Sequence, residues 1–491
     1  MRRFLMPLLA ILCFAMLSGS GQGIALATDF FLTIGGGYAP SGNQASLENN
    51  VLYFQRVLRE VKPDAANNDV YFSDGRSSGH DLQVMDPNSV PKANRLMAEF
   101  FGSQSSLGLS YRNHQVPDVR GSTKPENIRL WFEHVGDKMK SGDRLVLFVT
   151  AHGNGSRDQK TPFDTTIATW NNTAIKMTEF VGMLDELPDG VQVVAVMVQC
   201  HAGGFARMIF NEGDPDKGLS KQQRCGFFAT VHDRPAAGCT AEVDESSYVE
   251  YSTYFWAALS GRTRTGETID LPDYNGDGVV SFDEAHAYTI LTADTIDLPV
   301  KTSGEFLTQY SKFGDDDPKL LKNDASYQTV LSLATTTQRV VLEGLSKQLN
   351  LTGDNRLVDA WEQLESLRDR GRSRRRRGDT SAGQLRGKIA SDLKKRWPEL
   401  ANVLNPVSVQ LLTSRQREFI DAIENHEDYK RYRELADASA PDDAKRRVKF
   451  DRFLRVADNV LLAENLRRIN DPQRIAQYEA LVAAEAGVLR D

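Results

Sequence analysis

Cysteine, long apolar segments and excess positive charge are all scarce in this sequence, and each shortage excludes a class of protein. Four of the 491 residues are cysteine, and none belongs to a Cys-x-x-Cys pair, so a zinc site of the usual spacing is excluded. The chain has no P-loop. Its formal net charge of −7 argues against a general nucleic-acid binder. The hydrophobic content of 40% suffices for at least one large core and for two or three domains.

The longest apolar run lies near the N-terminus. It covers Phe4 to Leu17, 14 residues, which is too short to span a bilayer, and it follows two arginines. The small-residue sequence ALA comes directly before Thr28 and fits a cleavage site. We therefore predict a signal peptide over residues 1–27, with an uncleaved anchor as the alternative. The mature protein is then expected in the periplasm or outside the cell, without a membrane segment.

The predicted mature chain has an odd number of cysteines. Cys13 leaves with the signal peptide, and Cys200, Cys225 and Cys239 remain. Cys225 and Cys239 flank a loop and could pair as a disulfide in an oxidising compartment. Cys200 would then be a free thiol, which is either functional or buried and inert.

Strand-like and helix-like segments alternate through the first half of the mature chain. Apolar runs such as Val191–Cys200 are typical of strands that are covered on both faces. The segment 46–61 predicts an amphipathic helix with Ser46 as its N-cap. The stretch from Arg76 to Pro125 is polar and is expected to be rich in loops. This alternation predicts an α/β fold, a mostly parallel sheet flanked by helices.

Strand signals end near residue 325, and helical spacing follows to the C-terminus. We therefore predict two regions, an α/β domain over 28–325 and an all-helical region over 326–491. The basic run Ser373–Asp379 interrupts the helical pattern. It is either a solvated loop or a processing site for a trypsin-like protease.

Two predicted strands end in residues that can carry out nucleophilic catalysis. The run Arg144–Ala151 leads into His152-Gly153, and the run Gln192–Gln199 leads into Cys200. Catalytic groups of open α/β sheets gather at the carboxyl ends of strands. A Cys200 thiolate would be the nucleophile, and His152 would handle its proton and protonate the leaving amine. The amides of Gly153 and Cys200 are the candidate oxyanion hole. A core cysteine and a plain His-Gly turn are the alternatives.

The motifs TAHG and QCHAGGF resemble the paired motifs of the caspase-like cysteine peptidases, among them legumains and metacaspases. The segment FFATVHDRPAAGCTAEVDESSY is similar to legumain. The likeness covers about Asp29 to Ile290 and implies a caspase-like fold and endopeptidase activity on peptides or proteins, through a thioester acyl-enzyme. Members of these families carry an acid two residues before the nucleophile, where this chain has Val198, and legumain has an arginine near the position of Gly42.

The same resemblance extends to the substrate pocket and the helical region. Asp244, Ser246 and Ser247 are candidates to line the pocket. The helical region could cover the active site until it is cleaved, as the C-terminal helical part of legumain does. His201 is a second imidazole beside the nucleophile, but adjacent residues point apart, which favours His152 as the base. A metal site of Cys200, His201 and His152 is the alternative without supporting spacing.

The segment DYNGDGVVSFDE matches the EF-hand loop pattern at every constrained position. The pattern predicts a Ca²⁺ site whose ligands are Asp273, Asn275, Asp277, the Val279 carbonyl, Ser281 and Glu284. The preceding residues do not predict a helix, so this is half an EF-hand. An Asp-Gly turn held by side-chain hydrogen bonds is the alternative.

These features favour an exported, calcium-dependent cysteine endopeptidase without an organic cofactor. A catalytically silent calcium-binding or interaction module of the same fold, a transpeptidase using the same dyad, and a helical scaffold are the other hypotheses.

Overall fold

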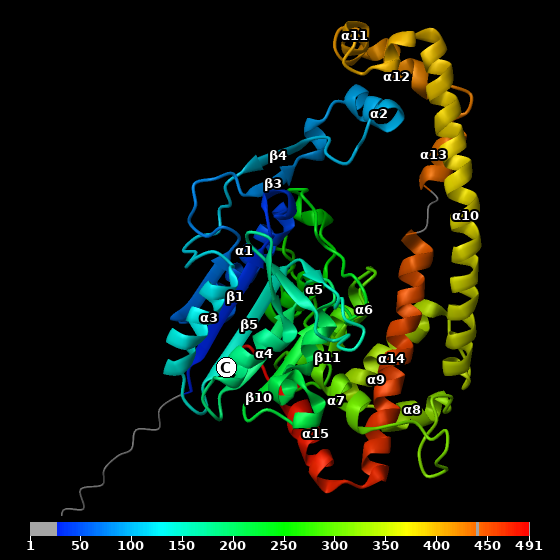
Figure 1. The fold of residues 1–491 in the computed structure, drawn as a ribbon. Helices are drawn as coiled ribbons and strands as arrows, with labels where there is room; N and C mark the ends of the chain where they lie inside the picture. Colours follow the sequence, from blue (N-terminus) through cyan, green and yellow to red (C-terminus); the bar gives the residue numbers. More distant parts are fainter. Residues whose placement is uncertain (1–26, 438–440, 491) are drawn as a thin grey trace, which may run out of the picture.

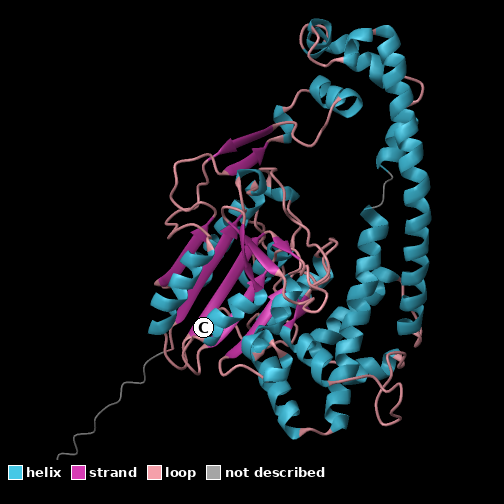
Figure 2. Cartoon of the chain, viewed as in Figure 1, coloured by secondary structure: helices cyan, strands magenta, loops and turns pink. Residues whose placement is uncertain are grey.

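The computed structural model describes residues 27–437 and 441–490, and the predicted signal peptide lies outside them apart from Ala27. Within these residues the fold is built on a six-stranded sheet in the order β11-β10-β9-β5-β1-β2 (Figures 1 and 2). Every neighbouring pair is parallel except β10 and β11. The strands are β1 Asp29–Gly36, β2 Asn67–Phe72, β5 Arg144–Ala151, β9 Gln192–Met197, β10 Gln223–Phe228 and β11 Val300–Lys301.

Helices cover both faces of this sheet, as the apolar strands require. Alternate residues of β1, β5 and β9 pack in two separate buried clusters, one for each face. One cluster includes side chains of α1, α5, α6 and α7, and the other includes those of α3 and α4. The helices are α1 Ala45–Val61, α3 Pro125–His134, α4 Met177–Asp185, α5 Tyr251–Ser260, α6 Phe282–Thr292 and α7 Thr302–Tyr310. The predicted α/β architecture is thus confirmed, as a mixed sheet with mostly parallel strands.

Smaller elements occupy the segments between the main strands. The stretch predicted to be loop-rich contains a two-stranded sheet and a helix, and a three-stranded sheet begins directly after His152. The N-cap of α1 is Gln44, two residues earlier than the predicted Ser46. These elements are β3 Leu82–Met85, α2 Lys92–Phe101, β4 Leu109–Arg112, β6 Gly153–Asn154, β7 Thr166–Thr169 and β8 Thr173–Lys176.

The C-terminal region is helical, as predicted, and its long helix α10 stands along one side of the molecule (Figure 1). The basic run Ser373–Asp379 is not a loop, because α10 continues through it; its side chains lie outside the described residues. Helix-forming residues on both sides extend the helix across the run. The helices are α8 Tyr327–Leu333, α9 Thr336–Leu349, α10 Arg356–Arg396, α11 Pro406–Leu412, α12 Gln416–Glu424, α13 Tyr429–Asp437, α14 Pro441–Ile469 and α15 Pro472–Glu485.

The last two helices share the core of the sheet. Leu462 and Leu466 of α14 and Leu481 of α15 belong to the same buried cluster as Val146 and Phe227 of the sheet. At the other end, the tip formed by α11, α12 and the second half of α10 packs on α2. The helical region is therefore packed against the α/β part at both ends.

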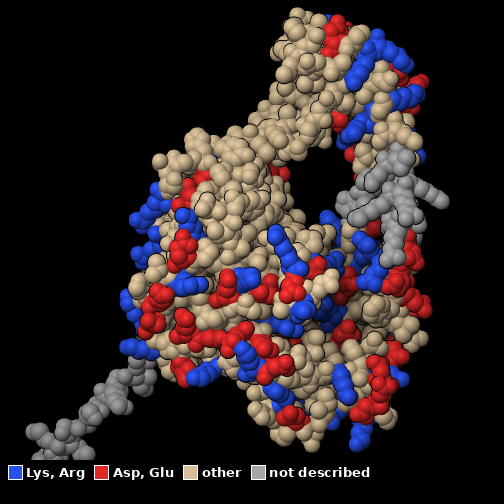
Figure 3. Space-filling view, in the orientation of Figure 1, with Lys and Arg blue, Asp and Glu red and all other residues tan. Residues whose placement is uncertain are grey.

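The surface carries mixed charge in the view of Figure 3, with acidic and basic side chains interspersed. None of the described helices has the length and apolarity that a bilayer-spanning helix needs.

Candidate active site

The sheet places His152 and Cys200 just after two neighbouring strands, at its carboxyl edge. β5 and β9 pair in parallel, and Val149 of β5 is level with Met197 of β9. His152 and Cys200 each follow these paired residues by three positions, so the two strands deliver them to the same level. β5 and β9 are therefore direct neighbours in the sheet.

The His152 side chain is held by three neighbours. Its Nε2 lies 2.8 Å from Gln44 Oε1, and the ring of Tyr38 packs edge-on with centroids 5.4 Å apart. Burial lowers the pKa of His152, and the Gly42 carbonyl acts in the opposite direction. An acceptor at Nε2 favours the tautomer with its proton there, which leaves the Nδ1 lone pair free to accept a proton. Neutral His152 is thus suited to the role of base.

The Cys200 sulfur faces the loop after β10 rather than the interior of the sheet. The Ala236 amide donates a hydrogen bond to Cys200 Sγ at 3.3 Å. Within residues 27–437 and 441–490, no group accepts a hydrogen bond from the Cys200 amide, which leaves that donor available to an oxyanion.

Small residues around Cys200 allow close backbone approach. A Cβ on Gly153 would clash with the Cys200 carbonyl oxygen and lie 2.9 Å from the Thr166 carbonyl. A Cβ on Gly203 would lie 2.7 Å from the Thr230 carbonyl, at the end of β10. The glycines after the nucleophile position and after His152 are therefore required by packing between turns.

The side chain of His201 is bonded to the loop after β10 and is not placed to act as the base. Its backbone is left-handed, with φ of 62°, and its Nδ1 lies 2.8 Å from the His232 carbonyl oxygen. Among the described residues, the group that brings three possible metal-ligand atoms within 4.8 Å of one another is Asp74, Asp81 and His114. Cys200, His201 and His152 do not form such a group.

The disulfide between Cys225 and Cys239 is not formed, and this prediction was wrong. Cys225 lies on β10 with 1% exposure inside the core, and burial raises the pKa of its thiol. Cys239 is a free thiol whose Sγ lies 3.6 Å from His152 Nδ1. Cys239 is thus a second thiol in the candidate active site.

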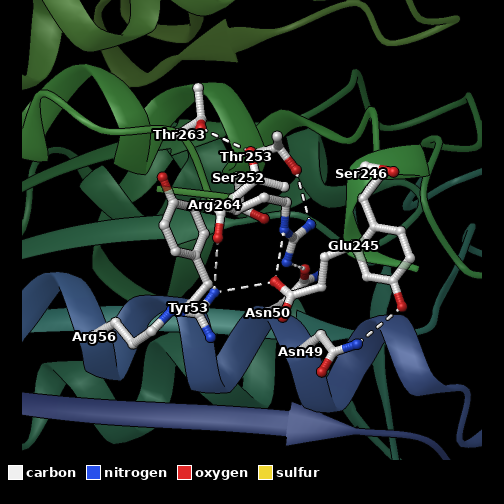
Figure 4. Close-up of polar contacts among 12 residues, drawn as sticks. Asn49, Asn50, Tyr53, Arg56, Glu245, Ser246, Ser252, Thr253, Thr263 and Arg264 are labelled. Carbon is white, nitrogen blue, oxygen red and sulfur yellow. Dashed lines mark hydrogen bonds and ion pairs between the residues drawn. The ribbon is translucent and has the colours of Figure 1, made fainter. Parts of the chain in front are cut away.

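The three residues predicted to line the pocket lie in a compact turn. Asp244 Oδ1 accepts hydrogen bonds from the amide and the hydroxyl of Ser246, and Ser247 Oγ donates to the Asp244 carbonyl. Figure 4 shows how the neighbouring Glu245 fastens this turn: its carboxylate contacts Arg264, which also bonds Asn50 of α1 at 2.9 Å. These bonds hold the turn against α1, and the role of its residues in a substrate pocket stays a prediction.

The predicted calcium loop folds as an Asp-rich turn before α6. The segment from Arg262 to Pro272 is not helical, so the expected absence of a helix before the loop is confirmed for these described residues. Asp273 accepts hydrogen bonds from the amides of Gly276 and Gly278, and Glu284, 1% exposed, accepts from the Tyr274 amide. Ser281 and Glu284 form a capping box at the start of α6.

The three carboxylates of this described loop do not converge on one point. Within the described chain, the carboxylates of Asp273, Asp277 and Glu284 do not bring three oxygens within 4.8 Å of one another. Asn275 donates to Asp277 Oδ2, and Asp277 Oδ1 accepts from the Val279 amide. These hydrogen bonds are the ones expected for the Asp-Gly turn. The predicted metal ligands are nevertheless all oxygen atoms, which Ca²⁺ prefers.

In the Asp74, Asp81 and His114 group, Asp81 and His114 bond the backbone, whereas Asp74 Oδ1 is buried without a hydrogen-bond partner among the described residues. Asp81 is 1% exposed, and its Oδ1 accepts from the His114 amide at 2.8 Å. His114 Nε2 lies 2.8 Å from the Gly75 carbonyl. These bonds fix Asp81 and His114 around the start of β3.

Sequence reasoning missed Gln44, Ala236 and the position of Cys239. Gln44 and Ala236 carry no motif, and they reach the site through loops distant in the chain. The odd cysteine count was a signal for Cys239, but chain separation alone suggested the wrong partner.

Comparisons with known proteins add no assignment. No protein-family model matches the chain, and no curated protein matches it. A solved protein of Geobacter sulfurreducens is similar at 11% identity with a TM-score of 0.29; the match covers 56% of this chain and 92% of that one. A likeness this weak carries no argument about fold or function.

Proposed function

We propose that this chain is an exported cysteine endopeptidase in which Cys200 is the nucleophile and His152 is the proton carrier. The observation that carries the proposal is the register of β5 and β9, which brings a histidine and a cysteine level at the carboxyl edge of a mostly parallel sheet. The resemblance of TAHG and QCHAGGF to caspase-like peptidases supports the same assignment.

The reaction follows from the groups present. The Cys200 thiol passes its proton to His152, and the sulfur attacks the carbonyl carbon of the scissile peptide bond. The amides of Gly153 and Cys200 receive the developing oxyanion. The imidazolium then protonates the leaving amine, which breaks the C–N bond, and water hydrolyses the thioester.

Cys239 makes a sharp test necessary, because its sulfur rather than that of Cys200 contacts His152 Nδ1. Cys200 nevertheless follows the strand that pairs with the strand before His152, and the Ala236 amide donates a hydrogen bond to its sulfur. We therefore assign attack to Cys200 and treat Cys239 as a neighbour that shares the imidazole.

The test is cleavage of a diverse peptide mixture by wild type, Cys200→Ala and Cys239→Ala. The proposal requires that all cuts disappear in Cys200→Ala and persist in Cys239→Ala. The reverse pattern would make Cys239 the nucleophile. Wild type without cuts but with joined peptides would indicate a transpeptidase, and wild type without either product would favour the silent module.

The calcium loop is part of the proposal as a stabilising site. Asp273, Asn275, Asp277, the Val279 carbonyl, Ser281 and Glu284 would hold Ca²⁺, which would supply a fixed charge at the start of α6. The support is the oxygen-only donor set at EF-hand spacing.

A further inference from the structure

The loop that contacts both candidate catalytic residues spans residues 231–239, after β10. Its Ala236 amide bonds Cys200 Sγ, and its Cys239 thiol contacts His152 Nδ1. Its carbonyls at His232 and Arg234 accept hydrogen bonds from the ring and the amide of His201. The loop therefore contacts both catalytic side chains and contributes to how they face one another.

The 231–239 loop is held from outside by α14 of the helical region. Arg234 Nη1 lies 3.1 Å from Asp451 Oδ2 of α14. The next residue of α14, Arg452, is 2% exposed and donates to the Asp297 carbonyl at 2.9 Å, while Asp297 Oδ1 accepts from the Ala237 amide. Arg452 also donates to the carbonyls of Ile290 and Ala293 and to Thr295 Oγ1, so α14 is fixed at this height.

We propose that Asp451 and Arg234 are positioning residues, which hold the 231–239 loop so that the Cys200 thiol and His152 can react. This inference rests on the proposed function and gives the helical region a supporting role in catalysis. It replaces the idea of a cover that is removed, because α14 supports the site from the side while its apolar face shares the sheet's core.

A separate readout distinguishes positioning from general stability. The Arg234 and Asp451 side chains are 34% and 18% exposed, and ion pairs of this kind contribute little to folding. The melting temperature of Asp451→Asn or Arg234→Gln should therefore change by no more than about 2 °C. The reactivity of Cys200 depends on the geometry of its neighbours and should change much more.

The experiment measures the rate of iodoacetamide alkylation at Cys200 against pH, assigned by peptide mass spectrometry, together with peptide cleavage. In the full chain, Asp451→Asn and Arg234→Gln should each shift the pH at which the alkylation rate of Cys200 is half-maximal. Each should also lower kcat about tenfold with little change in KM. Lys445→Gln is the matched control, because Lys445 joins α14 to Asp294 at 3.0 Å away from the loop. Arg368→Gln is a second control, because Arg368 Nη2 contacts the other oxygen of Asp451, Oδ1, at 3.6 Å.

Unchanged alkylation in both single variants, or equal effects in Lys445→Gln, would overturn the positioning role. The alkylation readout does not require peptidase activity. If the variants shift the pH dependence of alkylation but the wild type cuts no peptide, the proposed function is refuted and the positioning role of Arg234 and Asp451 is kept. If the variants cleave peptides normally and their alkylation is unchanged, the positioning role is refuted and the proposed function is kept.

Discussion

Replacement of Gly153 by alanine tests the packing of the two catalytic turns against each other. The new Cβ would clash with the Cys200 carbonyl and lie 2.7 Å from Gln199 Cγ and 2.9 Å from the Thr166 carbonyl. Two of these three neighbours are backbone atoms, which cannot rotate away. The turn that carries Cys200 must therefore move relative to His152.

Overpacking of this kind costs about 1–3 kcal/mol of folding free energy. Urea unfolding of Gly153→Ala should show a loss in this range, and peptide cleavage should fall by more than the stability loss explains. Gly182→Ala is the control: this α4 glycine has no atom within 4 Å of the added Cβ, and alanine should stabilise its helix by about 0.5–1 kcal/mol. Unchanged stability and cleavage in Gly153→Ala would refute the close approach of the two turns.

Three further outcomes follow from the structure. Leu466→Ala, at 1% exposure in the shared core, should cost about 2–5 kcal/mol in urea unfolding, whereas Leu404→Ala, at 80% exposure, should cost almost nothing; equal effects would contradict the packing of α14 into the sheet's core. Burial lowers the pKa of His286 from 6.5 to about 3, so the unfolded chain takes up a proton that the folded chain refuses, and stability should fall as pH drops from 6.5 toward 3; His286→Gln should flatten this slope in unfolding curves, and an unaltered slope would refute the assignment. Addition of Ca²⁺ should raise the melting temperature of wild type but not of Asp277→Ala, and a chelator should reverse the rise; an equal rise in both would place the ion elsewhere.

The main strands could be predicted because strands covered on both faces are apolar along their whole length, as in β5 and β9. The 48 positions between His152 and Cys200 leave room for a crossover helix, which made adjacent strands possible, but β6, β7 and β8 in that segment were not predicted. The environment of His152 could not, because Gln44 lies more than 100 positions away and no local pattern aims it at the ring. The Cys225–Cys239 pairing failed because a short chain separation does not show that Cys225 points into the core from β10.

In the helical region too, the helices could be predicted from the sequence but their packing could not. Helical spacing predicted its helices, yet a continuous α10 through the basic run was not expected, since the flanking glycines resemble helix stops. The packing of Leu462 and Leu466 into the sheet's core depends on contacts between residues more than 200 positions apart, such as Phe227. A helical periodicity shows which face is apolar but does not identify the surface that covers it.

The most direct test of the account is the attachment site of a peptide-based covalent inhibitor that reacts with catalytic thiols. Peptide mass spectrometry of wild type treated with a mixture of peptidyl acyloxymethyl ketones would locate the modified residue. The account predicts modification at Cys200, which disappears in His152→Ala and persists in Cys239→Ala. Modification at Cys239 instead, or modification at Cys200 that does not depend on His152, would contradict the assignment of the dyad.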